Sequence, residues 1–302
     1  MSRVATIPLQ RTMSAAIQHS QQLLAATQQQ LATGKKANDY ASLGTEAVRN
    51  LSTHSLRARQ DAYAGVSSRI GTTLTLNDAN IGAIDTSAMS LKQDLLTAIG
   101  TGTGDGVNAS ITAAFNQFRA ALNASSGDGS LFGGSRTDGP PFVPATLAAT
   151  IGVPASAAFA NDAVKASARL SDNVDVEYGV TASDIGSSLY TAFQTLAGAG
   201  TIGNPPSPAQ FNILSQAAAQ IDTGLTDLRG VNAENGRKQA QVETLGTRAT
   251  DHAILLQGII AGNEDADLGQ VAIDLAQQKT MLQASYSVFS QLSGLSLASY
   301  LR

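Results

Sequence analysis

The stretch VSSRIGTTLTLNDANIGAIDTSAMSLKQDLLTA, residues 66–98, carries the pattern that decides the fold. Its apolar and small polar residues recur at alternating steps of four and three, a heptad pattern held for about four repeats. Such a repeat predicts one long helix that packs against a second helix along a narrow seam. The predicted seam residues are Val66, Ile70, Thr73, Asn77, Ile81, Ile84, Ala88, Leu91, Leu95 and Ala98.

The C-terminal region repeats this rhythm in two segments, separated by the acidic sequence NEDAD at 263–267. A long apolar seam left exposed would aggregate, so each segment requires a helical partner. The first seam comprises Leu214, Ala218, Ile221, Leu225, Leu228, Val242, Leu245, Ala249, His252, Leu256 and Ile259. The second comprises Leu268, Val271, Leu275, Leu282, Phe289 and Leu292.

The N-terminal region contains a helix that could pack against these C-terminal segments. Ile17, Leu24 and Leu31 lie seven residues apart, and Gly34 followed by two lysines is typical of a helix C-terminus. Residues 1–100 hold nine basic and six acidic side chains, a net charge of +3, whereas residues 210–302 hold six and nine, a net charge of −3. Surface ion pairs are worth less than about 1 kcal/mol each, so packing must contribute most of the pairing energy.

Between these regions, residues 101–209 contain seven of the eight prolines. The segment DNVDVEYGV at 172–180 alternates apolar and polar residues, which predicts a short strand. The expected fold is mainly α: a long antiparallel helical hairpin or coiled-coil bundle of the N- and C-terminal arms, with a small β-rich or mixed insert domain in the middle. The predicted domains are terminal helical arms at 1–42 and 268–302, a helical bundle core at 43–125 and 208–267, and a Gly/Pro-rich variable outer domain at 126–207.

The composition excludes several classes of protein. The chain has no cysteine, so it contains neither a disulfide framework nor a thiolate metal site. A net charge of −4 argues against a nucleic-acid partner. The longest apolar run, AILLQGIIAG at 253–262, is too short to span a bilayer, and the first residues do not form a cleavable secretory signal. We therefore expect no nucleic-acid binding and no membrane insertion.

No catalytic constellation is present in the sequence. His19, His54 and His252 are far apart, and the position of His252 on a seam predicts a core histidine. The glycines of GTGTGDG at 100–106 follow a helical segment rather than the strand that a dinucleotide fingerprint needs. Glu264, Asp265 and Asp267 lack the ligand spacing of an EF-hand and predict a solvated helix start. We expect no enzyme activity, no catalytic or metal-binding residues, and no cofactor.

The segment DGSLFGGSRTDGPPF at 128–142 is rich in turn-forming residues and holds two phenylalanines. A phosphate-binding loop would require a following Lys-Ser/Thr pair, which is missing. The segment is instead interpreted as a structural corner where helix gives way to the variable domain, with its apolar anchors buried. The residues assigned to this corner are Phe132, Gly133, Gly134, Pro140, Pro141 and Phe142.

Both ends of the chain resemble one family. TQQQLATGKKAND at 27–39 and AIDLAQQKTMLQASYSVFSQLSGLSLASYLR at 272–302 are similar to the terminal segments of bacterial flagellins and their junction relatives. LFGGSRTDGPPF at 131–142 is similar to the LFxGxxTxxxPF pattern of the junction proteins. The resemblance covers roughly the first 140 and last 90 residues. It departs at 37–50, where many relatives carry Asp-Asp-Pro and this chain has Asn38, Asp39 and Tyr40.

The resemblance implies a structural protein that is secreted through the flagellar channel and located at the hook–filament junction. The implied partners are further copies of the chain in a ring or helical assembly, the first hook–filament junction protein, flagellin, and a cytoplasmic export chaperone at the C-terminal segment. A filament flagellin and a cell-surface ligand-binding protein on a flagellin scaffold remain alternatives. The expected assembly residues are Ile17, Leu24, Leu31, Leu268, Val271, Leu275, Leu282, Tyr286, Phe289, Leu292, Leu295, Leu297, Tyr300 and Leu301.

Overall fold

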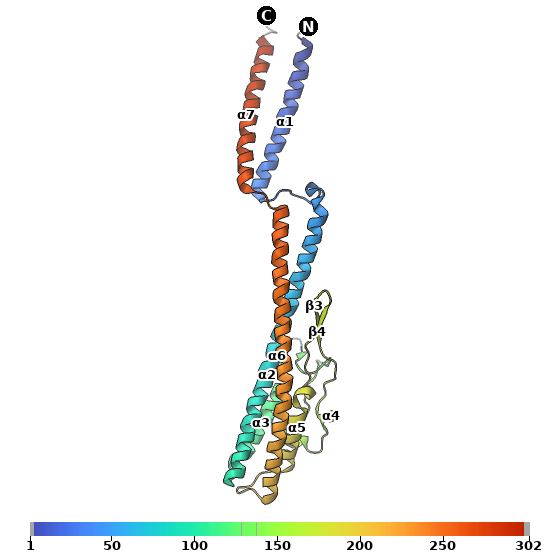
Figure 1. Cartoon of the computed structure of the whole chain (residues 1–302), viewed down its shortest axis with the longest axis vertical. Coiled ribbons are helices and arrows are strands. Elements are labelled where there is room, and N and C mark those ends of the chain that lie inside the picture. Colours follow the sequence, from blue (N-terminus) through green and yellow to red (C-terminus); the bar gives the residue numbers. More distant parts are fainter. Residues whose placement is uncertain (1–2, 128, 137, 299–302) are drawn as a thin grey trace. The chain divides into compact units, whose positions relative to one another are not determined.

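The computed structural model describes residues 3–127, 129–136 and 138–298, most of them in helices (Figure 1). The chain divides into two compact units: unit 1, residues 1–58 and 252–302, and unit 2, residues 59–251. Two long helices, α2 (Glu46–Thr101) and α6 (Pro208–Glu264), each contribute to both units. The predicted class, mainly α with long packed helices and a small stranded region in the middle, is confirmed. The finer domain bounds predicted above stay a prediction.

Unit 1 contains α1 (Arg3–Thr33), the short 3-10 helix η1 (Ala41–Leu43) and α7 (Leu268–Ala298), together with the start of α2 and the end of α6. Figure 1 shows α1 and α7 side by side. Helix α1 ends as predicted before Gly34, whose φ of 69° lies in the left-handed region that favours glycine. Helix α7 begins after Asp267, whose carboxylate accepts hydrogen bonds from the amides of Gly269 and Gln270 at 2.9 and 3.2 Å.

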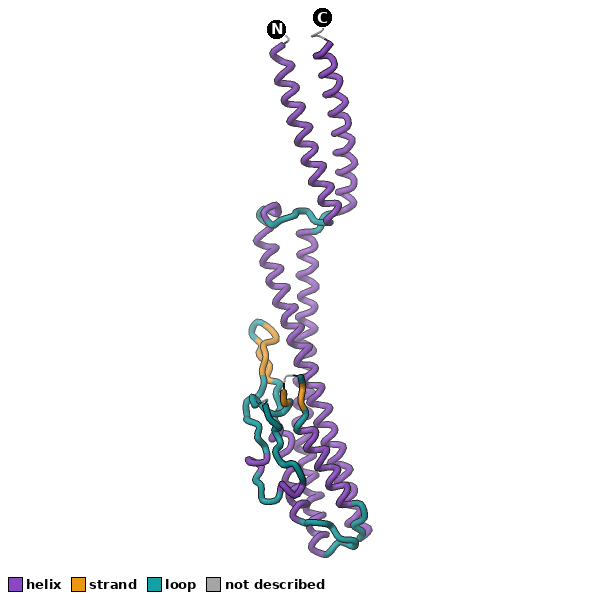
Figure 2. Tube along the Cα trace, turned by 180° about the vertical axis from the view of Figure 1, so that it is seen from behind, coloured by secondary structure: helices purple, strands orange, loops and turns teal. Residues whose placement is uncertain are grey.

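Unit 2 adds two helices, α3 (Val107–Leu122) and α5 (Ala182–Gly198), that share one apolar core with α2 and α6. The segment between them holds η2 (Leu147–Thr150), α4 (Ala155–Ala158) and two antiparallel hairpins, β1 (Ser125–Ser126) with β2 (Gly129–Ser130) and β3 (Ser167–Ser171) with β4 (Val174–Glu177). Figure 2 shows the β3–β4 hairpin and its flanking loops on one side of the helices of this unit. The strand predicted within 172–180 corresponds to β4.

Within unit 2, α2 and α6 are antiparallel along the predicted seam. Lys92 Nζ lies 2.5 Å from Asp222 Oδ1, and Arg229 Nε lies 2.7 Å from Asp85 Oδ1. Further along, Asn235 donates to the carbonyl of Leu74 at 2.9 Å. The residues predicted to form the seam of α2 are buried from Ile70 onward. The exception is Thr73, whose place is taken by the buried Leu74.

An aromatic cluster fastens the turn-rich segment to this core. Phe132 and Phe142 are both 0% exposed. The ring of Phe142 lies 5.3 Å from those of Phe118 and Phe159 and 5.8 Å from that of Tyr190, measured between centroids. Such edge and tilted contacts add to the free energy gained by burying the rings.

Hydrogen bonds fix the same segment from both sides. The side chain of Asn123 donates to the carbonyl of Phe142 and accepts from its amide, both at 2.9 Å. Gly134 has a φ of 70°, and a side chain there would collide with Asp162, which accepts from the amide of Ser135 at 2.9 Å. Gly133 and Pro141 are buried and Pro140 is exposed. These contacts hold the segment against the core, and its role as a structural corner stays a prediction.

The seam predicted for the end of α6 is wrong by one residue. His252 is exposed and Ile259 is 49% exposed, whereas Ala253 and Ile260 are buried. A straight α-helix drifts by about 20° per heptad relative to a strict seven-residue repeat. Over the heptads between Leu228 and Ile259 this drift approaches one residue, so the inward position moves. His252 is therefore not a core histidine.

Candidate assembly surface on the terminal helices

Large apolar side chains are exposed mainly in unit 1, the smaller of the two units. Of the twenty large hydrophobic residues that are exposed in the described part of the chain, fourteen belong to unit 1 and six to unit 2. Exposed apolar side chains that lie together mark interaction sites, so unit 1 holds the candidate assembly surface. The fourteen are Leu23, Leu31, Tyr40, Val48, Leu51, Leu56, Ile254, Leu255, Ile259, Leu268, Ile273, Met281, Tyr286 and Val288.

The pairing of α1 with α7 buries few of their own side chains. Ile17 and Val271 are the large apolar residues buried among those that the structure describes on these two helices. Gln21 donates a hydrogen bond to the hydroxyl of Tyr286 across the pair. The pair therefore leaves most of its described large apolar side chains exposed or half-buried.

Helix α7 carries large apolar side chains on more than one side. Val271 faces inward, yet Ile273, Met281 and Val288 are 62%, 53% and 45% exposed and point in other directions. Between 268 and 298 the sequence carries only Asp274 and Lys279 as charged residues. A helix with apolar side chains on more than one side packs against more than one partner, and α1 covers only the side that holds Val271.

The expected assembly residues fall into three groups. Ile17 and Val271 are buried, and Leu24, Leu275, Leu282 and Phe289 are half-buried. Leu31, Leu268 and Tyr286 are exposed by 41%, 50% and 45%. Leu292, Leu295 and Leu297 belong to α7, with side chains outside the description, and Tyr300 and Leu301 lie outside the described residues.

A polar network centred on Glu264 joins the helix ends of unit 1. The Oε1 atom of Glu264 lies 2.6 Å from both Asn50 Nδ2 and His54 Nε2, and its Oε2 atom lies 3.2 Å from Lys35 Nζ. The hydrogen bond from His54, with those from Asn50 and Lys35, lowers the pKa of Glu264 from its usual 4.5 to about 2 against the opposing effect of burial. Its side chain is 19% exposed, so the predicted solvated helix start is wrong for Glu264, which ends α6.

Backbone hydrogen bonds complete this joint. The amide of Lys36 donates to the carbonyl of Glu264 at 2.7 Å, and the amide of Ala266 donates to the carbonyl of Gly34 at 2.9 Å. Lys35 also pairs with Asp265 at 2.6 Å. Because the partners are more than 200 residues apart, no local sequence signal pointed to this network.

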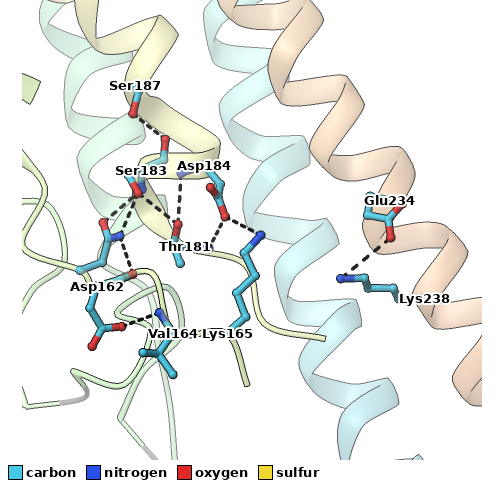
Figure 3. A network of polar contacts seen from close by, with 10 residues as sticks. Asp162, Val164, Lys165, Thr181, Ser183, Asp184, Ser187, Glu234 and Lys238 are labelled. Carbon is cyan, nitrogen blue, oxygen red and sulfur yellow. Dashed lines mark hydrogen bonds and ion pairs between the residues drawn. The ribbon is translucent and has the colours of Figure 1, made fainter. Parts of the chain in front are cut away.

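A second polar network lies in unit 2 and is also satisfied within the chain (Figure 3). Lys165 pairs with Asp184 at 3.1 Å, and Lys238 lies 3.9 Å from Glu234. These four residues line a cleft of about 460 Å³ between the start of α5 and α6. The Lys165–Asp184 pair joins the loop before β3 to the start of α5, whereas the Glu234–Lys238 pair lies within α6.

The described residues contain no group of three or more His, Asp or Glu side chains placed to hold a metal ion. Across the described ranges, no helix combines the length and the hydropathy that crossing a bilayer requires.

Comparisons with solved structures identify proteins that have a similar fold. No protein-family model and no curated protein sequence matches the chain. Among solved structures, the chain resembles a protein assigned as a flagellar hook-associated protein of Vibrio parahaemolyticus, with a TM-score of 0.60 at 14% identity over 74% of this chain and 98% of that one. It also resembles FlgL of Bacillus cereus, with a TM-score of 0.51 at 14% identity over 64% and 98%. This chain thus has the fold of flagellar hook-associated proteins.

Proposed function

We propose that this chain is a structural adaptor of the bacterial flagellum that joins the hook to the flagellin filament. The observation that carries the proposal is the exposed apolar side of α7, with Ile273, Met281 and Val288, which α1 does not cover. In a chain with a hook-associated fold, that surface is suited to packing between neighbouring copies. Its role is mechanical, and the proposal includes no catalytic step.

The proposed assembly is a ring or short helix of copies whose terminal helices form the inner contacts. On the hook side the partner is the first hook–filament junction protein, and on the filament side it is flagellin. Because α1 and α7 carry few charges, apolar burial and glutamine side chains supply these contacts. The chain is secreted through the flagellar export channel and resides at the junction.

Export before assembly requires that the apolar helices stay apart from one another. We propose that a cytoplasmic export chaperone covers the C-terminal segment 268–292 until secretion. An amphipathic or apolar helix held in a groove is a common mode of such recognition. Once released at the tip, the helix meets its neighbours in the assembly.

Immunogold electron microscopy of isolated flagella, with an antibody against residues 140–205, tests the location. A single cluster of gold where hook meets filament is the expected result. Gold along the whole filament would identify a filament flagellin, and gold confined to the cell body would indicate a surface ligand-binding protein. Either of the last two results would overturn the proposed adaptor role.

A further inference from the structure

The uncharged run AILLQGIIAG at 253–262 is not explained by packing within the chain. On the last turns of α6 in unit 1, Ala253 and Ile260 are buried, but Ile254 and Leu255 are 64% and 66% exposed and Ile259 is 49% exposed. A helix that faces water is expected to carry polar residues on that side. Here the outward side is aliphatic.

Two glycines lie at the middle of this outward side. Gly258 and Gly262 are four residues apart, and both are exposed. At 100° per residue they lie opposite the buried pair Ala253 and Ile260, with Leu255 beside them. The four positions 255, 258, 259 and 262 form a shallow groove of the kind that receives side chains of a neighbouring helix, with a glycine floor and aliphatic walls.

Nothing within the chain requires these glycines. A Cβ added at Gly258 or Gly262 would meet no atom within 4 Å, although glycine in a helix interior is less favourable than alanine. In unit 2, by contrast, Gly224 lies against Leu189, and Gly246 lies against Ser67. Other open helix glycines exist, such as Gly236, but among described helical residues only Gly258 and Gly262 lie four apart between exposed aliphatic side chains.

We propose that this glycine-floored groove of α6 receives the start of α2 from a second copy of the chain, with Val48 and Leu51 as the inserted side chains. Val48 is 78% exposed and Leu51 60%, and their exposed neighbours Ser52 and Ser55 are uncharged, like the groove. The contact joins two different faces, so repetition produces a ring or a helix rather than a closed dimer. It rests on the proposed function because it requires copies to assemble.

The size of the two faces indicates when the contact forms. A fully exposed aliphatic side chain offers about 100 Å² of apolar surface, so the four side chains involved, Leu255, Ile259, Val48 and Leu51, bury a few hundred Å². A stable stand-alone interface buries at least about 1,200 Å². The groove therefore does not hold two dilute copies together and is occupied only where the terminal helices already bring copies side by side.

Filling the groove tests this proposal. In the variant Gly258→Leu with Gly262→Leu, the added Cβ atoms meet no atom within 4 Å and both positions are exposed, so the purified variant should melt at the wild-type temperature or higher. In the organism that makes the chain, the same variant is released into the medium instead of remaining in isolated flagella. The matched control Gly236→Leu, also exposed and open on α6, stays in flagella. Retention of the groove variant at the wild-type level would overturn the proposal.

Cross-linking gives a second and independent measurement. The chain has no cysteine, so Val48→Cys with Ile259→Cys introduces the only thiols. Oxidised flagella should then yield dimers and higher multimers on a non-reducing gel, whereas Val143→Cys with Ile259→Cys should not. Chain present in flagella without this ladder would overturn the groove contact and leave the adaptor role intact. Chain absent from flagella in wild-type cells would overturn both.

Discussion

The Nε2 atom of His54 lies 2.6 Å from Oε1 of Glu264, although 210 residues separate them in sequence. Around this contact, Lys35 comes from the loop after α1, His54 and Asn50 from α2, and Glu264 from the last turn of α6. One carboxylate therefore holds three segments at the point where α1 and α7 leave the α2–α6 pair. The carboxylate oxygens accept all three contacts.

The pKa of Glu264 predicts a pH-dependent stability of unit 1. Its folded-state value of about 2 lies below the usual 4.5, so the stabilisation is fully present above about pH 4.5 and is lost as the pH falls toward 2. The shift corresponds to at most about 3 kcal/mol. Denaturation followed by circular dichroism at pH 7 and pH 3 should show a smaller difference for Glu264→Gln than for wild type.

The exposed carboxylate of Glu243 provides the matched control for this experiment. Glu243→Gln should leave the pH dependence of unfolding unchanged. An equal pH dependence in wild type and Glu264→Gln would mean that the network contributes no stability.

Loss of the Phe142 ring should destabilise unit 2. The side chain is 0% exposed and contacts four other aromatic rings, so Phe142→Ala should cost about 3–5 kcal/mol. Thermal unfolding measures the loss as a lower midpoint. Val143→Ala, next in sequence but 54% exposed, should change stability by less than about 0.5 kcal/mol. Equal midpoints for the two variants would contradict the role assigned to the corner.

A charge at Leu282 should prevent incorporation into flagella. The side chain is half-buried on α7, and Leu282→Asp places a carboxylate in a surface proposed to pack against neighbouring copies. Immunoblots of isolated flagella should lack this variant, while Gln283→Asp, exposed on the next position, should be retained in reduced or normal amount. Normal incorporation of Leu282→Asp would refute the packing of α7.

The terminal helices should be less stable in a dilute chain than the helices of unit 2. Because α1 and α7 bury few apolar side chains, their amides should exchange hydrogen faster than those of α3 and α5. Hydrogen exchange followed by mass spectrometry on the dilute chain, and again on isolated flagella, measures both states. Equal protection of all four helices in the dilute chain would exclude ordering on assembly.

One helix that the sequence analysis did not identify did have a local signal. Thr181 and Asp184 form a capping box at the start of α5, with the Thr181 hydroxyl accepting from the Asp184 amide at 3.2 Å. The spacing of Thr and Asp before an apolar run is readable in sequence. Strand β3 had no comparable signal, since SARLS lacks the β-branched alternation of β4 and pairs through tertiary context.

By itself, the sequence determined the long helices, the end of α1 at Gly34 and the antiparallel pairing of the two halves, because apolar periodicity and helix-end signals act over a few turns. Only the tertiary structure decided which side of α6 turns inward near residue 259, because helical drift accumulates along a straight helix. It alone also brought Lys35, His54 and Glu264 together. Contacts between residues that far apart leave no trace in local pattern, since they depend on where whole helices lie.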